Sequence, residues 1–407
     1  MSHRFLVSSA LLAVVLAVRA RQWLLMRKPL HQLFTGKEAS SGKPAVRCGT
    51  RKSALAMVQT RWVCGFLTSI HPSLSILVLD GVDTQADKIL NVSLKQLVIN
   101  ETATAKPSPG LFTKELEEGL AFGKYDFCVH SLKDVPTTLP EGMMIAAICE
   151  REDARDCIVF PHAQKLSLKE LKPGSVVGTS SVRREAMLRR DFPGLVIKLI
   201  RGNVQTRLQK LDSGEFDAIL LAVAGLVRLG LEHRIGQIMD PTKFPYGVSQ
   251  GSLGIECRQV DVELQQVLGG IQHQPSAQRC LCERALLREL EGGCQVPLGV
   301  ATRVYRNHNS SGDSVQDWLE IHCEILSLDG RITVQGSMQG PAVDCERMGV
   351  ALARQLRDEL GGKHLIKSDT DLEATWENIS KPTTNKRPIT FGSAENPLRC
   401  QQQDNQA

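Results

Sequence analysis

Residues 176–190 read VVGTSSVRREAMLRR, a short apolar run, a glycine and three hydroxyl residues followed by an amphipathic stretch. The apolar residues 175–178 predict a buried strand, and residues 181–191 predict a helix. A strand that passes through a tight polar turn into a helix is the building unit of α/β sheets. The stretch therefore indicates an α/β fold.

The polar turn of this unit is suited to an anion. Thr179, Ser180 and Ser181 place hydroxyls and backbone amides at the helix N-terminus, where anions bind. Arg183 and Arg184 in the first helical turn oppose the helix dipole, which disfavours cations there by about 0.3–1 kcal/mol. A bound anion would account for this arrangement. The turn has neither a GxxxxGKS nor a GxGxxG pattern, so it does not favour a nucleotide.

The same alternation of apolar and amphipathic segments extends from residue 45 to about residue 268. We expect strands at residues 75–79, 127–130, 144–148, 175–178, 195–200 and 217–222. Helix candidates between them include residues 111–122 and 181–191. This repetition predicts parallel sheets with helices on both faces.

The C-terminal third has a different pattern. Residues 278–291 predict a helix whose leucines share one face. The alternating segments 319–328 and 331–338 surround Asp329-Gly330, which predicts a hairpin. A second helix is expected over residues 350–360. These features predict a small α+β domain.

Two segments lack a sustained pattern. Residues 366–407 are rich in Thr, Asn, Gln, Pro and charge, which predicts a disordered tail. Residues 100–110 contain two prolines just before the LFTKELE helix and predict a mobile loop.

A second motif, VHSLKDVPTTLP at residues 129–140, follows a strand of the buried type. Ser131, Lys133 and Asp134 come directly after this strand, and Pro136 then ends regular structure. Polar residues at the carboxyl end of a parallel strand are where α/β sheets place ligand groups. The local sequence equally fits a solvated turn in which Lys133 and Asp134 face water.

Further strand-end turns carry arginine. Arg51 lies in CGTRKSALA, Arg201 and Arg207 lie in IRGNVQTRL, and Arg228 follows AVAGLV. A single surface arginine is usually solvated. Four such turns imply a ligand with several carboxylates or phosphates, because guanidinium groups bind these anions in a bidentate manner. Each charge-assisted contact is worth roughly 1.5–3 kcal/mol.

A fourth motif, ERALLRELEGGCQVPLG at residues 283–299, ends a helix at two glycines. Cys294 follows them in a loop closed by Pro297. The small neighbours leave space around the sulfur for a bulky adduct.

Composition excludes several classes of protein. The 407 residues are 42% hydrophobic and 23% charged, which excludes a disordered polymer. Aromatic residues make up 4%, so few rings can stack on single-stranded nucleic acid. Residues 1–44 hold seven Lys or Arg and one Glu, which accounts for the formal net charge of +5 and leaves the rest close to neutral. We therefore expect no nucleic-acid partner, and anion recognition must be local.

Residues 1–44 have the features of a targeting sequence. Arg4 precedes an uncharged run, residues 5–18, that suits a signal peptide and is too short to span a membrane as a helix. The basic stretch at residues 21–43 has the chemistry of a transit peptide. We expect delivery to a plastid through the secretory pathway, without a permanent membrane anchor. A mitochondrion and plain secretion are the alternatives.

The 12 cysteines are scattered, with no CxxC pair and no histidine spacing suited to zinc. Most lie inside apolar runs, where a free cysteine acts as a small buried hydrophobe. A reducing compartment is expected, and extracellular disulfides are the alternative.

Together, VHSLKDVPT, GTSSVRR, IRGNVQTRL and EGGCQVP, in this order and spacing, resemble the porphobilinogen deaminases, also called hydroxymethylbilane synthases. The resemblance runs from about residue 46 to residue 300. It implies two α/β lobes of the periplasmic-binding-protein type and a small α+β domain that carries the cofactor loop. The implied parts are the leader 1–44, domain 1 at 45–151 and 249–272, domain 2 at 152–248, domain 3 at 273–365 and the tail 366–407.

The resemblance also implies a reaction. Members of the family are transferases that join four porphobilinogen units with release of ammonia to form hydroxymethylbilane, in heme and chlorophyll biosynthesis. Cys294 matches the cysteine that holds a dipyrromethane cofactor through a thioether, and no metal is involved. Asp134 matches the catalytic carboxylate, which would stabilise the azafulvenium cation left when ammonia departs. At about 4 Å and an effective dielectric of about 20, that attraction is roughly 4 kcal/mol, on the order of a thousandfold in rate.

Cofactor and substrate carry acetate and propionate groups, which accounts for the excess of arginine. The resemblance assigns binding of these groups to Arg51, Ser53, Lys133, Arg183, Arg184, Arg201, Arg207 and Arg228, supported by Ser131, Thr179, Ser180, Ser181 and Gln250. Members of the family are usually monomeric, so a monomer is expected.

The sequence departs from the family pattern in places. Ala86 and Ser249 stand where the family usually has glycine, and the segment Asn91–Pro109 is longer and lacks the usual lysine before Leu111. Two alternatives follow. One is a secreted two-lobed protein that binds an anionic solute, which would not need Gly-Gly-Cys in a third domain. The other is an inactive paralogue with the same fold.

Overall fold

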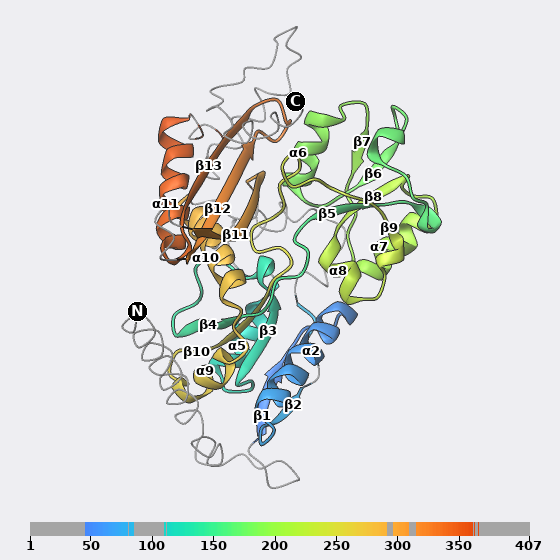
Figure 1. Cartoon of the computed structure of the whole chain (residues 1–407). Helices are drawn as coiled ribbons and strands as arrows, with labels where there is room; N and C mark the ends of the chain where they lie inside the picture. Colours follow the sequence, from blue (N-terminus) through green and yellow to red (C-terminus); the bar gives the residue numbers. More distant parts are fainter. Residues whose placement is uncertain are drawn as a thin grey trace, which may run out of the picture.

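The computed structural model describes residues 45–79, 81–84, 110, 112–290, 296–308, 315–360, 362 and 365. Within them the chain forms three β-sheets, which Figure 1 shows as three domains packed around a common centre. The leader, the segment Asn91–Pro109, Cys294 and the C-terminal tail lie outside the described residues, so the predictions made for them stay predictions.

The first lobe is a five-stranded sheet in the order β2-β1-β3-β10-β4. Its strands are β1 (Ala45–Gly49), β2 (Ser75–Val78), β3 (Phe127–Ser131), β4 (Met143–Ile148) and β10 (Leu253–Arg258). Its helices are α2 (Ala54–Ile70), α5 (Lys114–Ala121) and α9 (Val262–Gly269). Val63 and Leu67 of α2 and Leu264 of α9 pack with Phe127 and Ile255 of the sheet. The parallel pairing of β1 with β3 brings the carboxyl ends of both strands to one edge.

The second lobe repeats this arrangement in the order β7-β6-β8-β5-β9. Its strands are β5 (Asp156–Val159), β6 (Val176–Gly178), β7 (Val196–Lys198), β8 (Ala218–Ala222) and β9 (Ile235–Ile238). Its helices are α6 (Val182–Asp191), α7 (Val204–Asp212) and α8 (Val223–Arg228). Met187 of α6 packs in one core with Leu220, and Leu211 of α7 packs in another with Ile219. Because Leu220 and Ile219 are successive residues of β8, helices cover both faces of this sheet, as predicted.

The prediction of wholly parallel sheets is wrong for one strand in each lobe. β10 is antiparallel to β3 and β4, and β5 is antiparallel to β8 and β9. Two segments, residues 149–155 and 239–252, connect the lobes, and we call them the two crossings. β5 follows the first crossing and β10 follows the second, so each strand enters its sheet from the edge that faces the other lobe.

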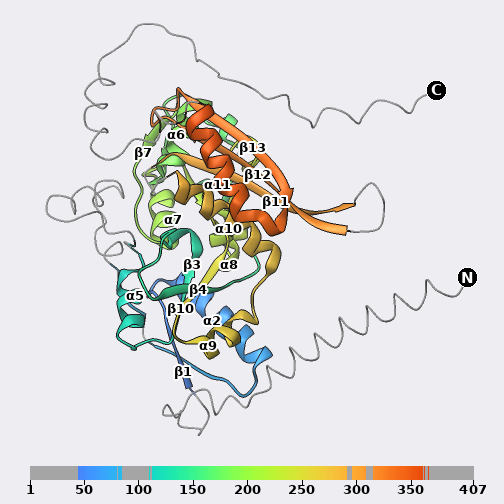
Figure 2. The same ribbon diagram turned by 90° about the vertical axis from the view of Figure 1, so that its left-hand side faces the viewer.

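The third domain is an antiparallel sheet, β11-β12-β13, packed against two helices. These elements are α10 (Gln274–Glu289), β11 (Leu298–His308), β12 (Val315–Leu326), β13 (Thr333–Pro341) and α11 (Cys345–Arg354). Leu286, Ile321 and Leu352 meet in its core. Figure 2 shows α11 lying along the sheet. β12 and β13 form the predicted hairpin, with Gly330 of its turn at φ +73°.

Short helical turns complete the described chain. They are η3 (Leu132–Asp134), η4 (Pro161–Ala163), η5 (Leu168–Glu170), η6 (Glu232–Arg234), η7 (Ala342–Asp344) and the π-helical turn η8 (Gln355–Glu359).

Most predicted elements are confirmed, with shifted ends. The helix predicted at residues 278–291 begins at Gln274, and the strand predicted at residues 195–200 is shorter. The sequence analysis missed β1, β5, β9, β10 and β11. In β10 the buried carboxylate Glu256 interrupts the apolar pattern by which such strands are found, and β5 begins with the buried carboxylate Asp156.

Glu283 of α10 joins the third domain to both crossings by hydrogen bonds and an ion pair. Its carboxylate accepts hydrogen bonds from Arg151 Nη1 at 2.6 Å and Nη2 at 3.0 Å, and from the Ser249 backbone N at 2.7 Å. Thr302 Oγ1 of β11 donates to the same carboxylate at 2.6 Å. Ser249 has φ +58°, a left-handed conformation that favours glycine, the residue that the resemblance leads one to expect at this position.

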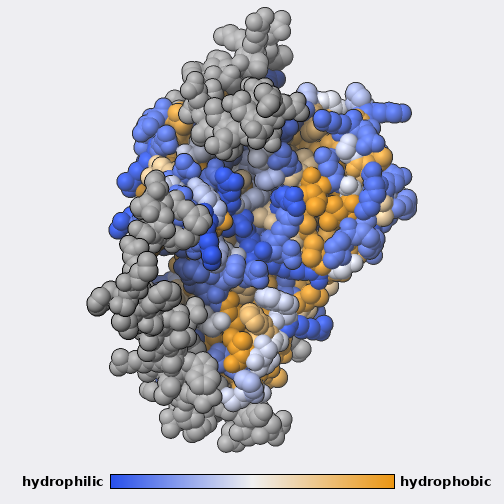
Figure 3. Space-filling model, in the orientation of Figure 1, coloured by the Kyte–Doolittle hydropathy of each residue, from blue (hydrophilic) through white to orange (hydrophobic). Residues whose placement is uncertain are grey.

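The surface and the buried cysteines of these domains bear on the expectations from sequence. No helix in the described ranges is long and apolar enough to cross a membrane. In Figure 3, hydrophilic residues cover the middle of the displayed face, where the three domains meet, and hydrophobic residues gather where α2 lies. Trp62 and Phe66 on α2 are 49% and 41% exposed. The ten cysteines among the described residues are free and buried, as their apolar surroundings predicted.

Candidate active site

Asp134 is placed by the end of β3. This strand is buried up to its last residue, and η3 follows it, with Leu132 fully buried beneath the turn. Pro136 cannot continue the turn as a helix. Lys133 and Asp134 therefore project from the edge of the first lobe, and the Asp134 side chain is 27% exposed. The turn itself forms as the sequence predicted.

Arg51, which follows β1, lies beside this carboxylate. Its Nη1 is 3.9 Å from Asp134 Oδ2, and its guanidinium carbon lies 4.8 Å from the centre of the Phe112 ring. An ion pair of this length between partly exposed groups is worth at most about 1 kcal/mol. The carboxylate thus remains available to a substrate.

Cations of the second lobe surround the same turn. Burial lowers the pKa of Arg207 to about 10, with Arg184 and Arg201 adding to the effect and Asp134 opposing it. Desolvation lowers the pKa of Lys133, opposed by Asp134 and reinforced by Arg184 and Arg207. Because the Lys133 side chain still reaches water, that desolvation is only partial. These mutual effects arise because residues of both lobes lie close together.

We call this group the inter-lobe site. It consists of Arg51, Lys133, Asp134, Arg184, Arg201 and Arg207.

Asp156, the first residue of β5, holds the arginines of α6. It is fully buried, and its Oδ2 accepts a hydrogen bond from Arg183 Nη1 at 2.7 Å. Its Oδ1 accepts hydrogen bonds from Arg184 Nε at 3.1 Å, Arg184 Nη2 at 2.7 Å and Gln250 Nε2 at 2.8 Å. Burial alone would raise the pKa of Asp156, but Arg183 and Arg184 hold it well below its usual range. One carboxylate that sequence reasoning missed thus gathers three predicted site residues.

This finding corrects one argument from sequence. The unfavourable position of Arg183 and Arg184 in the first turn of α6 does not by itself require a bound anion, because both pair with Asp156, which offsets one of their two positive charges. Arg183 Nη1 also donates to Pro245 O at 2.7 Å. Its Nε and Nη2 donate to no residue of the described chain, so Arg183 retains donors for a ligand.

The hydroxyl residues before α6 form hydrogen bonds within their own turn. Ser181 caps the helix by accepting from Arg184 N at 3.4 Å, and its backbone N donates to Thr179 Oγ1 at 3.2 Å. Thr179 is buried, and Ser180 is half-buried. An anion at this helix end stays a prediction.

A similar turn precedes α7. Asn203 caps the helix, accepting from Thr206 N at 2.9 Å, and Gly202 has φ +115°, which a side chain would strain. Arg207 Nε donates to Gly202 O at 2.8 Å, which fixes its direction, and Arg201 is 5% exposed.

The remaining predicted residues make structural contacts. Ser53 caps α2 by accepting from Ala56 N at 3.3 Å, and Ser131 Oγ donates to Gln59 Oε1 at 3.2 Å. Arg228 Nη2 of the second lobe donates to Gly251 O of the second crossing at 2.6 Å. Substrate contacts of these three side chains stay predictions.

Asp156 carried a signal that could have revealed it. It opens the apolar run DCIVF, where an ionised carboxylate is buried only if cations or donors meet it. Arg183 and Arg184, in the unfavourable first turn of the next predicted helix, were candidates for these cations. Gln59 and Glu283 carried no comparable signal, because both lie within helices that contain other polar residues.

Comparisons with known proteins show which family the sequence matches. The family model described as porphobilinogen deaminase, dipyromethane cofactor binding domain, matches residues 46–266, and that of the porphobilinogen deaminase C-terminal domain matches residues 277–358. The chain is 46% identical to a porphobilinogen deaminase of Prochlorococcus marinus over 79% of this chain and 96% of the relative. It is 45% identical to one of a Nostoc species over 81% of this chain and 96% of the relative.

Two solved structures match at lower identity. The VFT2 domain of Bordetella pertussis BvgS is 13% identical, with a TM-score of 0.33 over 61% of this chain and 90% of that domain. A periplasmic binding protein of Salmonella typhimurium is 13% identical, with a TM-score of 0.32 over 57% of this chain and 93% of that protein.

Proposed function

This chain belongs to the porphobilinogen deaminase family, and from that premise we propose that it is a transferase that joins four porphobilinogen units into hydroxymethylbilane with release of ammonia. The observation that carries the proposal is the inter-lobe site, where the partly exposed carboxylate of Asp134 lies among cations of both lobes. Such a site suits a substrate and a product that carry many carboxylates. The pathway served is tetrapyrrole biosynthesis.

The donor set fits a cofactor that carries several carboxylates. Arg184 and Arg201 each lower the pKa of Arg207, so like charges repel one another there. Anionic side groups would relieve this repulsion, and the free donors of Arg183 are available to them. The family domain matched by residues 46–266 binds dipyrromethane, and Cys294 would hold it through a thioether. When bound, it supplies the pyrrole to which substrate is joined.

Asp134 acts on the charge that develops during the reaction. When ammonia leaves the aminomethyl group of porphobilinogen, the pyrrole becomes a cation, and a carboxylate near its N–H stabilises it. Arg51 restrains this carboxylate at 3.9 Å without forming a strong bond to it. A full Coulomb contribution of roughly 4 kcal/mol at about 4 Å is worth on the order of a thousandfold in rate.

Asp156 is a positioning residue in this scheme. Its buried carboxylate fixes the side chains of Arg183 and Arg184, and so sets the direction of the N–H groups that they do not use. The oxygen that accepts from Arg184 also accepts from Gln250 and fixes that side chain. Fixed donors bind anionic groups with little loss of side-chain entropy.

Intact-mass measurement tests the cofactor and its attachment. Protein purified from cells supplied with porphobilinogen is expected to carry an adduct of two deaminated pyrrole units. Cys294→Ser is expected to lack the adduct and to form no hydroxymethylbilane. An unmodified mass for the parent chain, or full synthesis by Cys294→Ser, contradicts the proposal.

A turnover assay with porphobilinogen separates the alternatives. A secreted solute-binding protein would bind the anion without turnover, and membership of the family does not favour it. An inactive paralogue would lose turnover while keeping the fold. Consumption of porphobilinogen with stoichiometric release of ammonia excludes both.

We further propose that residues 1–44 deliver the chain to a plastid. The apolar run at residues 5–18 and the basic stretch after it support this proposal, as do the similar cyanobacterial proteins. A fluorescent protein fused behind residues 1–44 is expected to accumulate in plastids. Accumulation in mitochondria or secretion would contradict the proposal. Light scattering of the purified enzyme tests the proposed monomer.

A further inference from the structure

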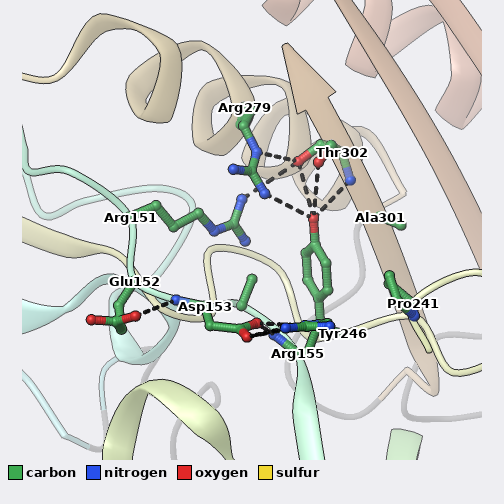
Figure 4. A pocket seen from close by; sticks show the side chains of 10 residues that line it. Arg151, Glu152, Asp153, Arg155, Pro241, Tyr246, Arg279, Ala301 and Thr302 are labelled. Carbon is green, nitrogen blue, oxygen red and sulfur yellow. Dashed lines mark hydrogen bonds and ion pairs between the residues drawn. The ribbon is translucent and has the colours of Figure 1, made fainter. Parts of the chain in front are cut away.

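A cavity outside the inter-lobe site lies where the two crossings meet the third domain. It has a volume of about 290 Å³, and Figure 4 shows the side chains around it. Arg151, Glu152, Asp153 and Arg155 line it from the first crossing, and Tyr246 lines it from the second. Arg279 of α10 and Thr302 of β11 complete it. None of the residues predicted to bind substrate or cofactor lines this cavity, so it is a separate feature of the chain.

Two of its three arginines are neutralised within the protein. Arg151 forms a two-point ion pair with Glu283, at 2.6 and 3.0 Å. Arg155 donates to both oxygens of Asp153 at distances from 2.6 to 3.0 Å. These pairs neutralise both arginines of the first crossing, and Glu152 adds a carboxylate to the lining.

Arg279 differs because its hydrogen-bond partners are neutral. Its Nε donates to Thr302 Oγ1 at 3.1 Å, and its Nη2 donates to Tyr246 OH at 3.2 Å. No carboxylate among the described residues lies within 4.0 Å of its guanidinium nitrogens, and its Nη1 has no hydrogen bond there. In Figure 4 the guanidinium of Arg279 lies beside that of Arg151, above the Tyr246 ring. A partly buried cation with free donors is thus held next to a cavity.

The groups that orient Arg279 are themselves fixed. Tyr246 OH accepts a hydrogen bond from Thr302 N at 2.7 Å, and the guanidinium of Arg151 lies 4.9 Å from the centre of the Tyr246 ring. An occupant would therefore meet donors already in place, which lowers the entropy cost of binding.

We propose that this cavity binds a small oxyanion, such as a phosphate or a small dicarboxylate, through the free guanidinium donors of Arg279. Charge-assisted hydrogen bonds from arginine suit both kinds of anion. The volume of about 290 Å³ limits the ligand to a small molecule.

The position of the cavity gives such a ligand a mechanical role. It would touch both crossings and the third domain at once. Arg151 Nε donates to Gln250 O at 2.8 Å, and the Gln250 side chain bonds to Asp156, so the cavity is connected to the arginines of α6. The bound anion stabilises this junction, because a ligand that binds only the folded state raises its stability.

The test is thermal unfolding of the full-chain holoenzyme with inorganic phosphate or malonate as separate probes, at constant ionic strength set with chloride. At concentrations about tenfold above Kd, the melting temperature is expected to rise by about 3–6 °C with at least one probe. The probe that acts distinguishes a phosphate site from a dicarboxylate site. No rise with either probe overturns the proposal.

Variants locate the effect. Arg279→Gln is expected to abolish the rise, and Arg279→Lys, which keeps the charge, is expected to retain part of it. Arg303→Gln, a matched change at an exposed arginine of the same domain, should leave the rise intact. Arg207→Gln tests the inter-lobe site, which also attracts anions. If Arg207→Gln removes the rise while Arg279→Gln keeps it, the anion binds between the lobes and the proposal is wrong.

A crystal of the holoenzyme soaked in selenate gives a readout that does not depend on stability. An anomalous peak within hydrogen-bond distance of Arg279 is expected. Its absence at a soak concentration that raises the melting temperature would place the anion elsewhere and overturn the proposal.

Discussion

Replacing Asp156 with asparagine tests whether one buried carboxylate organises the arginines of the second lobe. Asp156 is fully buried, and Arg183 and Arg184 are 5% and 6% exposed. The carboxylate accepts three hydrogen bonds from these arginines and one from Gln250. Asparagine keeps the shape and removes the charge, which leaves two buried cations without a counter-ion. Breaking a buried pair from one side costs about 3–5 kcal/mol. At about 2–4 °C per kcal/mol, the melting temperature should fall by about 6–20 °C.

A matched control lies in the same lobe. Asp212 pairs with Arg234 at 2.7 Å, but the Asp212 side chain is 33% exposed. Asp212→Asn should therefore cost at most about 1 kcal/mol. Both variants are compared by denaturant unfolding of the ligand-free protein. If Asp156→Asn destabilises the protein no more than Asp212→Asn does, the reasoning about Asp156 is refuted.

The pH dependence of this pair has a defined sign. The pKa of Asp156 is lowered on folding, from an ordinary value of 3.8. The stability from its pairing is therefore fully present above that ordinary value and is lost as the pH falls through the folded-state pKa. The difference between the parent and Asp156→Asn should stay constant from about pH 8 to about pH 5 and shrink only below about pH 4. A difference that declines above pH 5 would assign the effect to another group.

The remaining predictions concern the site and the second crossing. Asp134→Asn should keep the melting temperature within about 2 °C and lower turnover by roughly a thousandfold; near-normal turnover would remove Asp134 from catalysis. Arg207→Met should raise the melting temperature of the ligand-free protein by about 1–3 °C, because it relieves repulsion from Arg184 and Arg201, and should raise KM roughly tenfold. A lower melting temperature for this variant would show that repulsion is not important there. Ser249→Gly should stabilise the fold by about 1 kcal/mol in denaturant unfolding, since it removes a left-handed serine whose buried hydroxyl has no hydrogen-bond partner in the described chain. Loss of stability in that variant would mean that the backbone at the crossing is not strained.

Much of the candidate site could be predicted from local sequence. The polar turn after β3 and the capped starts of α6 and α7 depend on residues within a few positions of one another. Side chains at such turns are placed by short-range steric contacts and hydrogen bonds, which depend only on neighbouring residues in the sequence. Lys133, Asp134 and Arg207 were therefore assigned to turns and helix starts that the structure contains.

The missed elements have a common physical cause. β5 and β10 are antiparallel to their neighbours because the chain enters each sheet from a crossing. The direction of such a strand depends on how the chain connects the two lobes and not on the residues of the strand. Asp156 and Glu283 are buried charges whose partners lie elsewhere in the chain: Asp156 is paired with residues 27 and 28 positions away, and Glu283 with Arg151, 132 positions away. No local pattern encodes such partners.

The amino-acid sequence by itself determined the α/β units, the turns that end their strands and the residue types able to bind a polycarboxylate. Only the tertiary structure decided which arginines pair with Asp156 and which donors remain for a ligand. It also placed Arg279 beside the cavity between the two crossings and the third domain, where its hydrogen-bond partners are neutral. The reason is that local conformation depends on neighbours along the chain, whereas the free energy of a charge depends on the groups around it in space.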